Sequence, residues 1–203
     1  MRLFVTVNSP YARIVRVCAI ETGLDRQMDV QVVTVRDPRS ALLAYNPTGK
    51  VPTLLTDSGD VLSETRIILE HLDSLHEGEK FLADKGDLSG LADEGRLFGC
   101  LDGIATWARE FRRPEPKRFA WLTEVEHARA ARCFDFFESK RALLSNRVRL
   151  AQIALGCTLG FADGFLSDFH WRDGRPRLAE WYGSFSRRES MRSTRPRPST
   201  KTW

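Results

Sequence analysis

The first 76 residues alternate short runs typical of β-strands with segments whose hydrophobic residues have helical spacing. Residues 2–7 and 30–35 are rich in branched and aromatic side chains, which favours β-strands. Between them, residues 10–22 carry apolar side chains at helical spacing, and Gly23 follows where a helix-ending glycine belongs. A strand, a helix and a second strand form a βαβ unit, whose right-handed crossover makes the two strands parallel.

The pattern continues with a shorter helical segment over residues 38–45. Two short apolar runs at 53–56 and 60–62 then flank Asp57-Ser58-Gly59, a composition typical of a hairpin turn. From Glu64 onward the spacing is helical again, with apolar side chains at Ile68, Leu72 and Leu75. The predicted order of elements is βαβαββα.

Beyond Gly78 the apolar spacing predicts helices and no strand. A long amphipathic helix carries Leu97, Leu101, Ile104, Ala108 and Phe111 and ends before Pro114. Residues 122–137 predict a second helix, residues 150–161 a central one that is apolar around much of its circumference, and Pro176 opens the last. The last helix is expected to bury Leu178, Trp181, Tyr182 and Phe185.

This change of pattern predicts an α/β domain over residues 1–76, a polar linker over 77–87 and an all-helical domain over 88–186. The chain has 203 residues, 42% of them hydrophobic and 29% charged, as in an ordinary globular protein. Its net charge is +4, and residues 187–203 contain six basic residues and one acidic residue. We therefore predict a near-neutral folded body with a basic, flexible tail, and no nucleic-acid partner.

The cysteines and the N-terminus exclude other classes of protein. The four cysteines form no CxxC pair and lie near no histidine cluster, so we expect reduced thiols and no metal site. The N-terminal residues lack a long apolar signal core, and no run approaches the roughly 20 apolar residues of a membrane helix. We therefore expect a cytoplasmic protein that does not interact with membranes.

Three stretches carry a resemblance to a known family. They are Asn46-Pro-Thr-Gly-Lys-Val-Pro, the run Leu62-Ser-Glu-Thr-Arg that opens a helix, and Trp171-Arg-Asp-Gly-Arg-Pro near the C-terminus. In combination they resemble the cytosolic glutathione S-transferases, bacterial members in particular, over the chain to about Met191. The resemblance implies a thioredoxin-like first domain, glutathione as co-substrate, a helical domain with a pocket for the electrophile, and a homodimer.

The resemblance assigns glutathione binding first to the segment around Val51-Pro52. A cis peptide bond before Pro52 would turn Val51 outward, so that its backbone N–H and C=O pair with an extended peptide. The alternative is that Pro52 only shapes a turn. Lys50 is a candidate partner for the glycine carboxylate of glutathione, although an exposed lysine is more often simply solvated.

Glu64 and Thr65 stand in the first turn of a predicted helix, where unpaired N–H groups attract anions. The resemblance implies that Thr65 binds the γ-glutamyl carboxylate of glutathione and that Glu64 binds its ammonium group. Ordinary helix capping by Ser63 is the alternative, and the two roles are compatible.

The resemblance assigns thiol activation to Ser9, which stands where members that use cysteine carry it. Members that use tyrosine carry it on the first strand, where this chain departs from the pattern with Phe4 and Thr6. Ser9 before Pro10 is also a common start of a helix. A hydroxyl both donates and accepts, so Ser9 could cap the helix and still donate its proton to the sulfur. The substitutes considered for this role are Thr6, Asn8 and Tyr11.

The predicted walls of the electrophile pocket are Tyr11, Trp107 and Phe111, with Phe111 also in step with the core of its helix. The family usually begins its central helix with a capping box, where this chain has Arg149 and Gln152. Gln152 can still reach back to the start of that helix, but the hydroxyl of the cap residue is missing.

These residues favour a glutathione transferase that conjugates the glutathione thiolate to an apolar electrophile. A glutathione-dependent lyase, isomerase or thiol-disulfide reductase is an alternative with the same co-substrate. A non-catalytic binding module of the same fold is a third.

Overall fold

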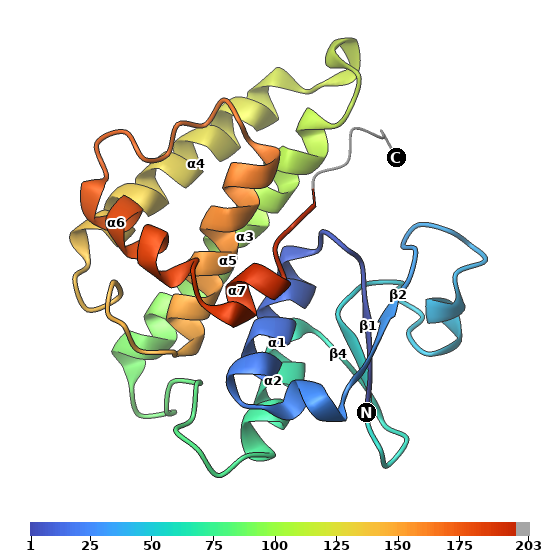
Figure 1. The fold of residues 1–203 in the computed structure, drawn as a ribbon. Helices are drawn as coiled ribbons and strands as arrows, with labels where there is room; N and C mark the ends of the chain where they lie inside the picture. The colour runs from blue at the N-terminus through green and yellow to red at the C-terminus, as the bar shows by residue number, and fades with distance from the viewer. Residues whose placement is uncertain (198–203) are drawn as a thin grey trace. The chain divides into compact units, whose positions relative to one another are not determined.

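The computed structural model describes residues 1–197 and divides the chain into two compact units, Met1–Leu82 and a second unit that begins at Ala83. The first unit contains a four-stranded sheet, two α-helices and two short 3₁₀ helices (Figure 1). In chain order these are β1 (Arg2–Val5), α1 (Pro10–Glu21), η1 (Leu24–Gln27), β2 (Asp29–Val32), η2 (Ala41–Ala44), β3 (Thr53–Leu55), β4 (Val61–Ser63) and α2 (Thr65–Ser74).

The strands lie in the order β2-β1-β3-β4, with β2 parallel to β1 and the other two pairs antiparallel. The parallel first pair is confirmed, and so is the predicted order of elements apart from the second helix. The segment predicted as a helix over residues 38–45 is only the single 3₁₀ turn η2, which is too short for an α-helix.

Helices α1 and α2 pack against each other on one face of the sheet (Figure 1). The apolar positions predicted to lie on one face of α1 are all buried, as are Ile68 and Leu72 of α2. Leu75 is an exception to the predicted series: it caps the C-terminal end of α2 and is 44% exposed. The apolar period therefore ends with the helix.

The second unit contains only helices among its described residues. They are α3 (Leu88–Phe111), η3 (Glu115–Lys117), α4 (Ala120–Ser139), α5 (Leu150–Phe165), α6 (Pro176–Phe185) and α7 (Glu189–Ser193). Helix α3 packs against both α4 and α5 (Figure 1). Eleven consecutive residues of the sixteen in α5, from Gln152 to Ala162, are buried, so the prediction of a central helix is confirmed. No described helix combines the length and apolarity that crossing a bilayer requires.

The C-terminal segment differs from the predicted flexible tail. Residues 189–193 form helix α7, and its Met191 is 1% exposed. A Cβ added to Gly156 of α5 would lie 3.1 Å from the Met191 methyl group, so α7 covers α5 at a position where only glycine fits. Met191, an apolar residue inside the basic segment, thus fixes part of that segment to the core. Residues 198–203 of the predicted tail lie outside the described part of the chain.

The start of α5 also differs from expectation. Arg149 caps this helix without a side-chain bond, and Gln152 does not reach back to it. The Gln152 amide nitrogen instead donates to the Leu143 carbonyl at 3.1 Å and faces the Ser145 hydroxyl at 3.4 Å. Gln152 therefore holds the preceding loop rather than the helix end.

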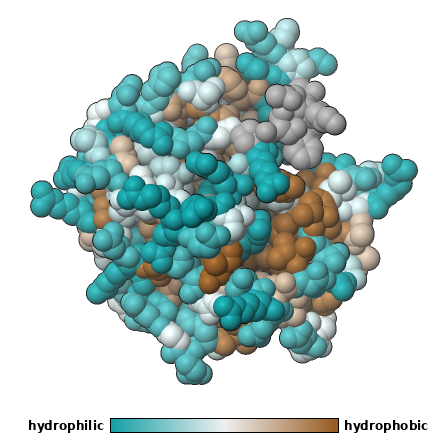
Figure 2. Space-filling view, in the orientation of Figure 1, coloured by the Kyte–Doolittle hydropathy of each residue, from teal (hydrophilic) through white to brown (hydrophobic). Residues whose placement is uncertain are grey.

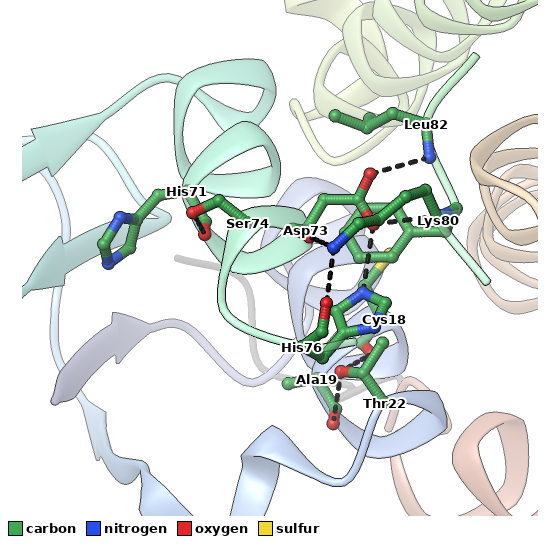
Figure 3. Close-up of polar contacts among 10 residues, drawn as sticks. Cys18, Ala19, Thr22, His71, Asp73, Ser74, His76, Lys80 and Leu82 are labelled. Carbon is green, nitrogen blue, oxygen red and sulfur yellow. Dashed lines mark hydrogen bonds and ion pairs between the residues drawn. The ribbon is translucent and has the colours of Figure 1, made fainter. Parts of the chain in front are cut away.

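The first unit continues past the predicted boundary at residue 76, because Asp73 near the end of α2 binds the chain that follows (Figure 3). Its carboxylate accepts hydrogen bonds from the backbone N–H groups of Phe81 at 3.0 Å and Leu82 at 3.3 Å. The same carboxylate lies 3.0 Å from His76 Nε2, and the Lys80 ammonium donates to the Asp73 carbonyl at 2.7 Å. Part of the predicted linker is thereby fixed to α2.

We predict that Asp73→Ala destabilises the protein by about 2–4 kcal/mol, because a buried and a part-buried N–H group lose a charged acceptor. Thermal unfolding followed by circular dichroism measures the loss. Asp57→Ala is the matched control, since the Asp57 carboxylate pairs with the N-terminal ammonium at an 82% exposed surface position. We expect that change to cost about 0–1 kcal/mol. Equal losses in the two variants would contradict a special role for Asp73.

Candidate functional site

Strand register brings the three predicted site segments of the first unit to one end of the sheet. Phe4 of β1 pairs with Thr53 of β3, which in turn pairs with Ser63 of β4. Because β3 runs antiparallel to both neighbours, the chain entering β3 lies beside the ends where β1 and β4 leave the sheet. The segments around residues 6–9, 50–52 and 64–65 therefore converge.

Asn46 orders the loop that leads into β3. Its side chain is 3% exposed, and its amide nitrogen donates to the Thr53 hydroxyl at 2.9 Å and to the Lys50 carbonyl at 3.3 Å. Its amide oxygen accepts from the Thr48 N–H at 3.0 Å and from the Thr48 hydroxyl at 2.8 Å. Asn46 was not among the predicted site residues. Its place at the start of the Asn-Pro-x-Gly motif was the one feature of the sequence that pointed to a role in the loop.

The loop presents the Val51 peptide group. The Val51-Pro52 bond is cis, as the sequence predicted. Pro52 is buried, whereas Val51 is half-buried and Lys50 is exposed. Among the hydrogen bonds of residues 1–197, none uses the Val51 backbone N–H or C=O. A backbone donor and acceptor are thus available for pairing with an extended peptide.

Glu64 and Thr65 form the start of α2. Glu64 is the N-cap residue, with φ +70° and ψ 129°, a backbone conformation that residues other than glycine rarely adopt. Its side chain makes no capping bond, and Ser63 is the last residue of β4. The prediction that Ser63 caps this helix is therefore wrong. Strained backbone of this kind concentrates at ligand sites.

The two side chains at this helix start are available for a ligand. The exposed Glu64 carboxylate forms no ion pair with another described residue. Thr65 is 7% exposed, and its hydroxyl makes no hydrogen bond within the described part of the chain. The first N–H groups of α2 are also free of intrahelical partners. An anion beside an ammonium group fits this arrangement.

Ser9 caps α1, as one of its two predicted roles requires. Its hydroxyl oxygen accepts the Ala12 N–H at 3.2 Å, and the Arg13 N–H reaches the Ser9 carbonyl at 3.0 Å. Ser9 is half-buried. The hydroxyl proton is donated to no other residue of the described chain, so it remains available to a ligand.

The predicted electrophile-binding residues lie in different units. Tyr11, in the first turn of α1, is half-buried. Trp107 of α3 is 4% exposed, and its ring packs edge-on against His127 and Phe169 with centroids 5.2 Å away in each case. Phe111 is half-buried beneath the Arg118 guanidinium, 4.6 Å from its ring centroid. Trp107 therefore packs in an aromatic cluster of the second unit, and a pocket role for these residues stays a prediction.

The surface of the first unit is partly apolar. On the face drawn in Figure 2, hydrophobic surface gathers over β1 and β2. The exposed apolar side chains of this part of the chain include Val7, Val30 and Val32, of which Val32 is 65% exposed.

Within residues 1–197, no cluster of three or more histidine, cysteine or acidic side chains is placed to hold a metal ion.

Two family models match the chain. The N-terminal domain of glutathione S-transferase matches residues 3–80, and the C-terminal domain of glutathione S-transferase matches residues 101–184. Each match lies within one of the two compact units. The predicted two-domain architecture, a thioredoxin-like α/β domain followed by an all-helical domain, is confirmed.

Solved structures and a curated sequence show the same likeness along the whole chain. A glutathione transferase family member from Pseudomonas fluorescens Pf-5 with bound glutathione is 32% identical, with TM-score 0.86 and coverage of 97% of this chain and 98% of that one. A glutathione S-transferase from Methylobacillus flagellatus KT with glutathione bound is 28% identical, with TM-score 0.84 and coverage of 97% and 99%. The uncharacterized GST-like protein YibF of Escherichia coli K12 is 25% identical over 97% of this chain and 98% of its own length.

We predict that Asn46→Ala loosens the loop before β3, because four hydrogen bonds of a buried amide are lost together. The expected cost is about 2–3 kcal/mol, with faster hydrogen exchange at the backbone amides of residues 48–53. Mass-spectrometric hydrogen exchange measures the effect. Thr48→Ala, which removes one of these bonds, is the control and should cost about 0.5–1 kcal/mol. Unchanged exchange in Asn46→Ala would remove this residue from loop ordering.

Proposed function

Because the chain belongs to the glutathione S-transferase family, we propose that it binds glutathione and transfers the glutathione thiolate to an electrophilic apolar small molecule. One observation carries the proposal: Ser9, the unpaired Val51 peptide and the strained start of α2 converge at one end of the sheet. The glutathione bound to the Pseudomonas and Methylobacillus relatives supports the choice of ligand.

Each end of the tripeptide has a complementary group in this proposal. The Val51 N–H and C=O pair with the glutathione backbone as an added strand would. The γ-glutamyl carboxylate binds the Thr65 hydroxyl and the free N–H groups of α2, where the helix dipole favours negative charge. The γ-glutamyl ammonium pairs with the Glu64 carboxylate. Lys50, exposed beside Val51, meets the glycine carboxylate.

Ser9 is the proposed activator of the thiol. A free thiol has a pKa near 8.5, so only a minority of glutathione is nucleophilic thiolate at neutral pH. The Ser9 hydroxyl accepts the Ala12 N–H and so keeps its own proton for donation to the sulfur. A hydrogen bond to the charged form lowers the pKa of the thiol. The thiolate then attacks the electrophilic carbon, and the leaving group departs with the bonding electrons or the adduct takes up a proton.

We predict that Ser9→Ala lowers kcat with a generic aromatic halide by about ten- to a hundredfold, while glutathione still binds. The loss follows from a higher pKa of the bound thiol, which ultraviolet titration of the thiolate measures directly. Ser9→Thr keeps both the capping oxygen and the donor, so it is expected to retain most of the rate.

Three outcomes separate the alternatives. An unchanged rate in Ser9→Ala would transfer the role to Thr6, Asn8 or Tyr11. Glutathione binding without acidification of the thiol would leave a binding module. Acidified thiol with no conjugation, but with turnover of a disulfide or an isomerisable substrate, would favour the other glutathione-dependent reactions.

We predict that Glu64→Gln weakens glutathione binding by about ten- to a hundredfold, because the ammonium group loses a charged partner. Isothermal titration calorimetry at low salt measures the dissociation constant. Glu70→Gln is the matched control on the same helix, since the Glu70 carboxylate lies 3.0 Å from Arg66 at a half-exposed position and has no proposed ligand role. Equal affinity in the two variants contradicts the role of Glu64.

A further inference from the structure

Two of the four cysteines face each other in the second unit, whereas the glutathione-binding residues of the proposed function belong to the first. Cys100 lies on α3 and is 2% exposed, whereas Cys133 lies on α4 and is half-buried. The two thiols interact, since each shifts the pKa of the other. The sequence predicts reduced thiols, because the four cysteines are scattered and form no CxxC pair.

Contacts on one side of the pair fix the register of the two helices. The Lys140 ammonium of α4 bonds the Asp93 carboxylate of α3. One turn further along α3, the Arg96 guanidinium lies 5.0 Å from the centroid of the Phe136 ring. Positions rise along α3 as they fall along α4, so the helices are antiparallel, and the next turn sets residue 100 opposite residue 133.

Contacts on the other side continue the same register. A Cβ added to Gly103 would meet the Glu126 carboxylate and lie 3.2 Å from Arg129 Cδ, so side chains of α4 lie against α3 one turn beyond Cys100. Cys100 therefore lies between two levels at which α3 and α4 are in contact. A disulfide at this level requires the two Cα atoms to lie roughly 4.4–6.8 Å apart.

The charges around the pair make the two thiols unequal. The hydrogen bond from Cys100 lowers the pKa of Cys133 to about 7, against the opposing effect of burial, and the guanidinium groups of Arg132 and Arg129 lower it further. The same hydrogen bond and burial raise the pKa of Cys100 well above its ordinary value. Cys133 is therefore the thiol that ionises first and is the more exposed of the two.

We propose that Cys100 and Cys133 are a redox site, which a low-molecular-weight dialkyl disulfide oxidises to an intramolecular disulfide that joins α3 to α4. The Cys133 thiolate attacks one sulfur of the small disulfide, forms a mixed disulfide and releases one thiolate. Cys100 then attacks Cys133 Sγ, the S–S bond to the small thiol breaks, and the leaving thiolate takes up the Cys100 proton. Two protein thiols are oxidised and one small disulfide is reduced to two thiols.

The test uses the full-length reduced protein and bis(2-hydroxyethyl) disulfide, which lacks the charged groups of glutathione and so does not depend on the proposed glutathione site. After denaturing alkylation with iodoacetamide, mass spectrometry of the intact chain and of its peptides is expected to show a Cys100–Cys133 crosslink that dithiothreitol reverses. The melting temperature is expected to rise on oxidation, because the crosslink restricts the unfolded chain.

Three single variants test the order of events. Cys133→Ser is expected to slow the reaction at least tenfold, because the remaining thiol of the pair is buried and protonated. Cys100→Ser is expected to stop at a lasting mixed disulfide on Cys133. Cys18→Ala, in the first unit, is the control and should crosslink as the unchanged protein does. Circular dichroism checks that each variant folds.

Results with the unchanged protein decide the proposal even where a variant does not fold. A mixed disulfide on Cys133 that persists without a crosslink would overturn it. A disulfide between two chains, visible on a non-reducing gel, would also overturn it, as would equal labelling of all four cysteines.

Discussion

Antiparallel pairing of β3 with both β1 and β4 is the constraint on which the candidate site depends. Leu54 of β3 pairs with Leu3 on one side and with Leu62 on the other, and Leu3 and Leu54 are completely buried. A slip of one residue would turn these leucines to the opposite face of the sheet, so the core enforces the register. That register brings Ser9, Val51 and the start of α2 to one end of the sheet.

Buried carboxylates of the helices fix backbone segments elsewhere in the chain. Asp73 binds the chain at residues 81–82, Glu94 accepts the Ala83 N–H at 2.8 Å, and Glu110 accepts the Phe119 N–H at 2.7 Å. Glu138 of α4 accepts the Leu178 N–H of α6 at 2.7 Å. Burial raises the pKa of Glu138, but hydrogen bonds from Leu178 and Arg177 outweigh it, so the pKa lies below its usual value. Acidic residues that a sequence pattern treats as solvated thus complete helix ends far along the chain.

Dependence on residues far along the chain also separates the missed parts of the site from the predicted ones. Ser9 before Pro10 and the cis bond at Pro52 follow from adjacent residues, and both were predicted. The four partners of Asn46 depend on how the loop folds back on itself, and the burial of Trp107 depends on rings from α4 and the segment after α5. Neither follows from spacing alone.

Hydrophobic period and local turn chemistry by themselves determined the order of elements, the two-domain division and the residues that begin α1 and β3, because those features depend on neighbours along the chain. Tertiary structure alone decided that Met191 anchors the C-terminal segment, that Glu138 caps α6 and that Cys100 meets Cys133. Each of these contacts joins residues at least 30 positions apart, and only the packing of helices brings such residues together.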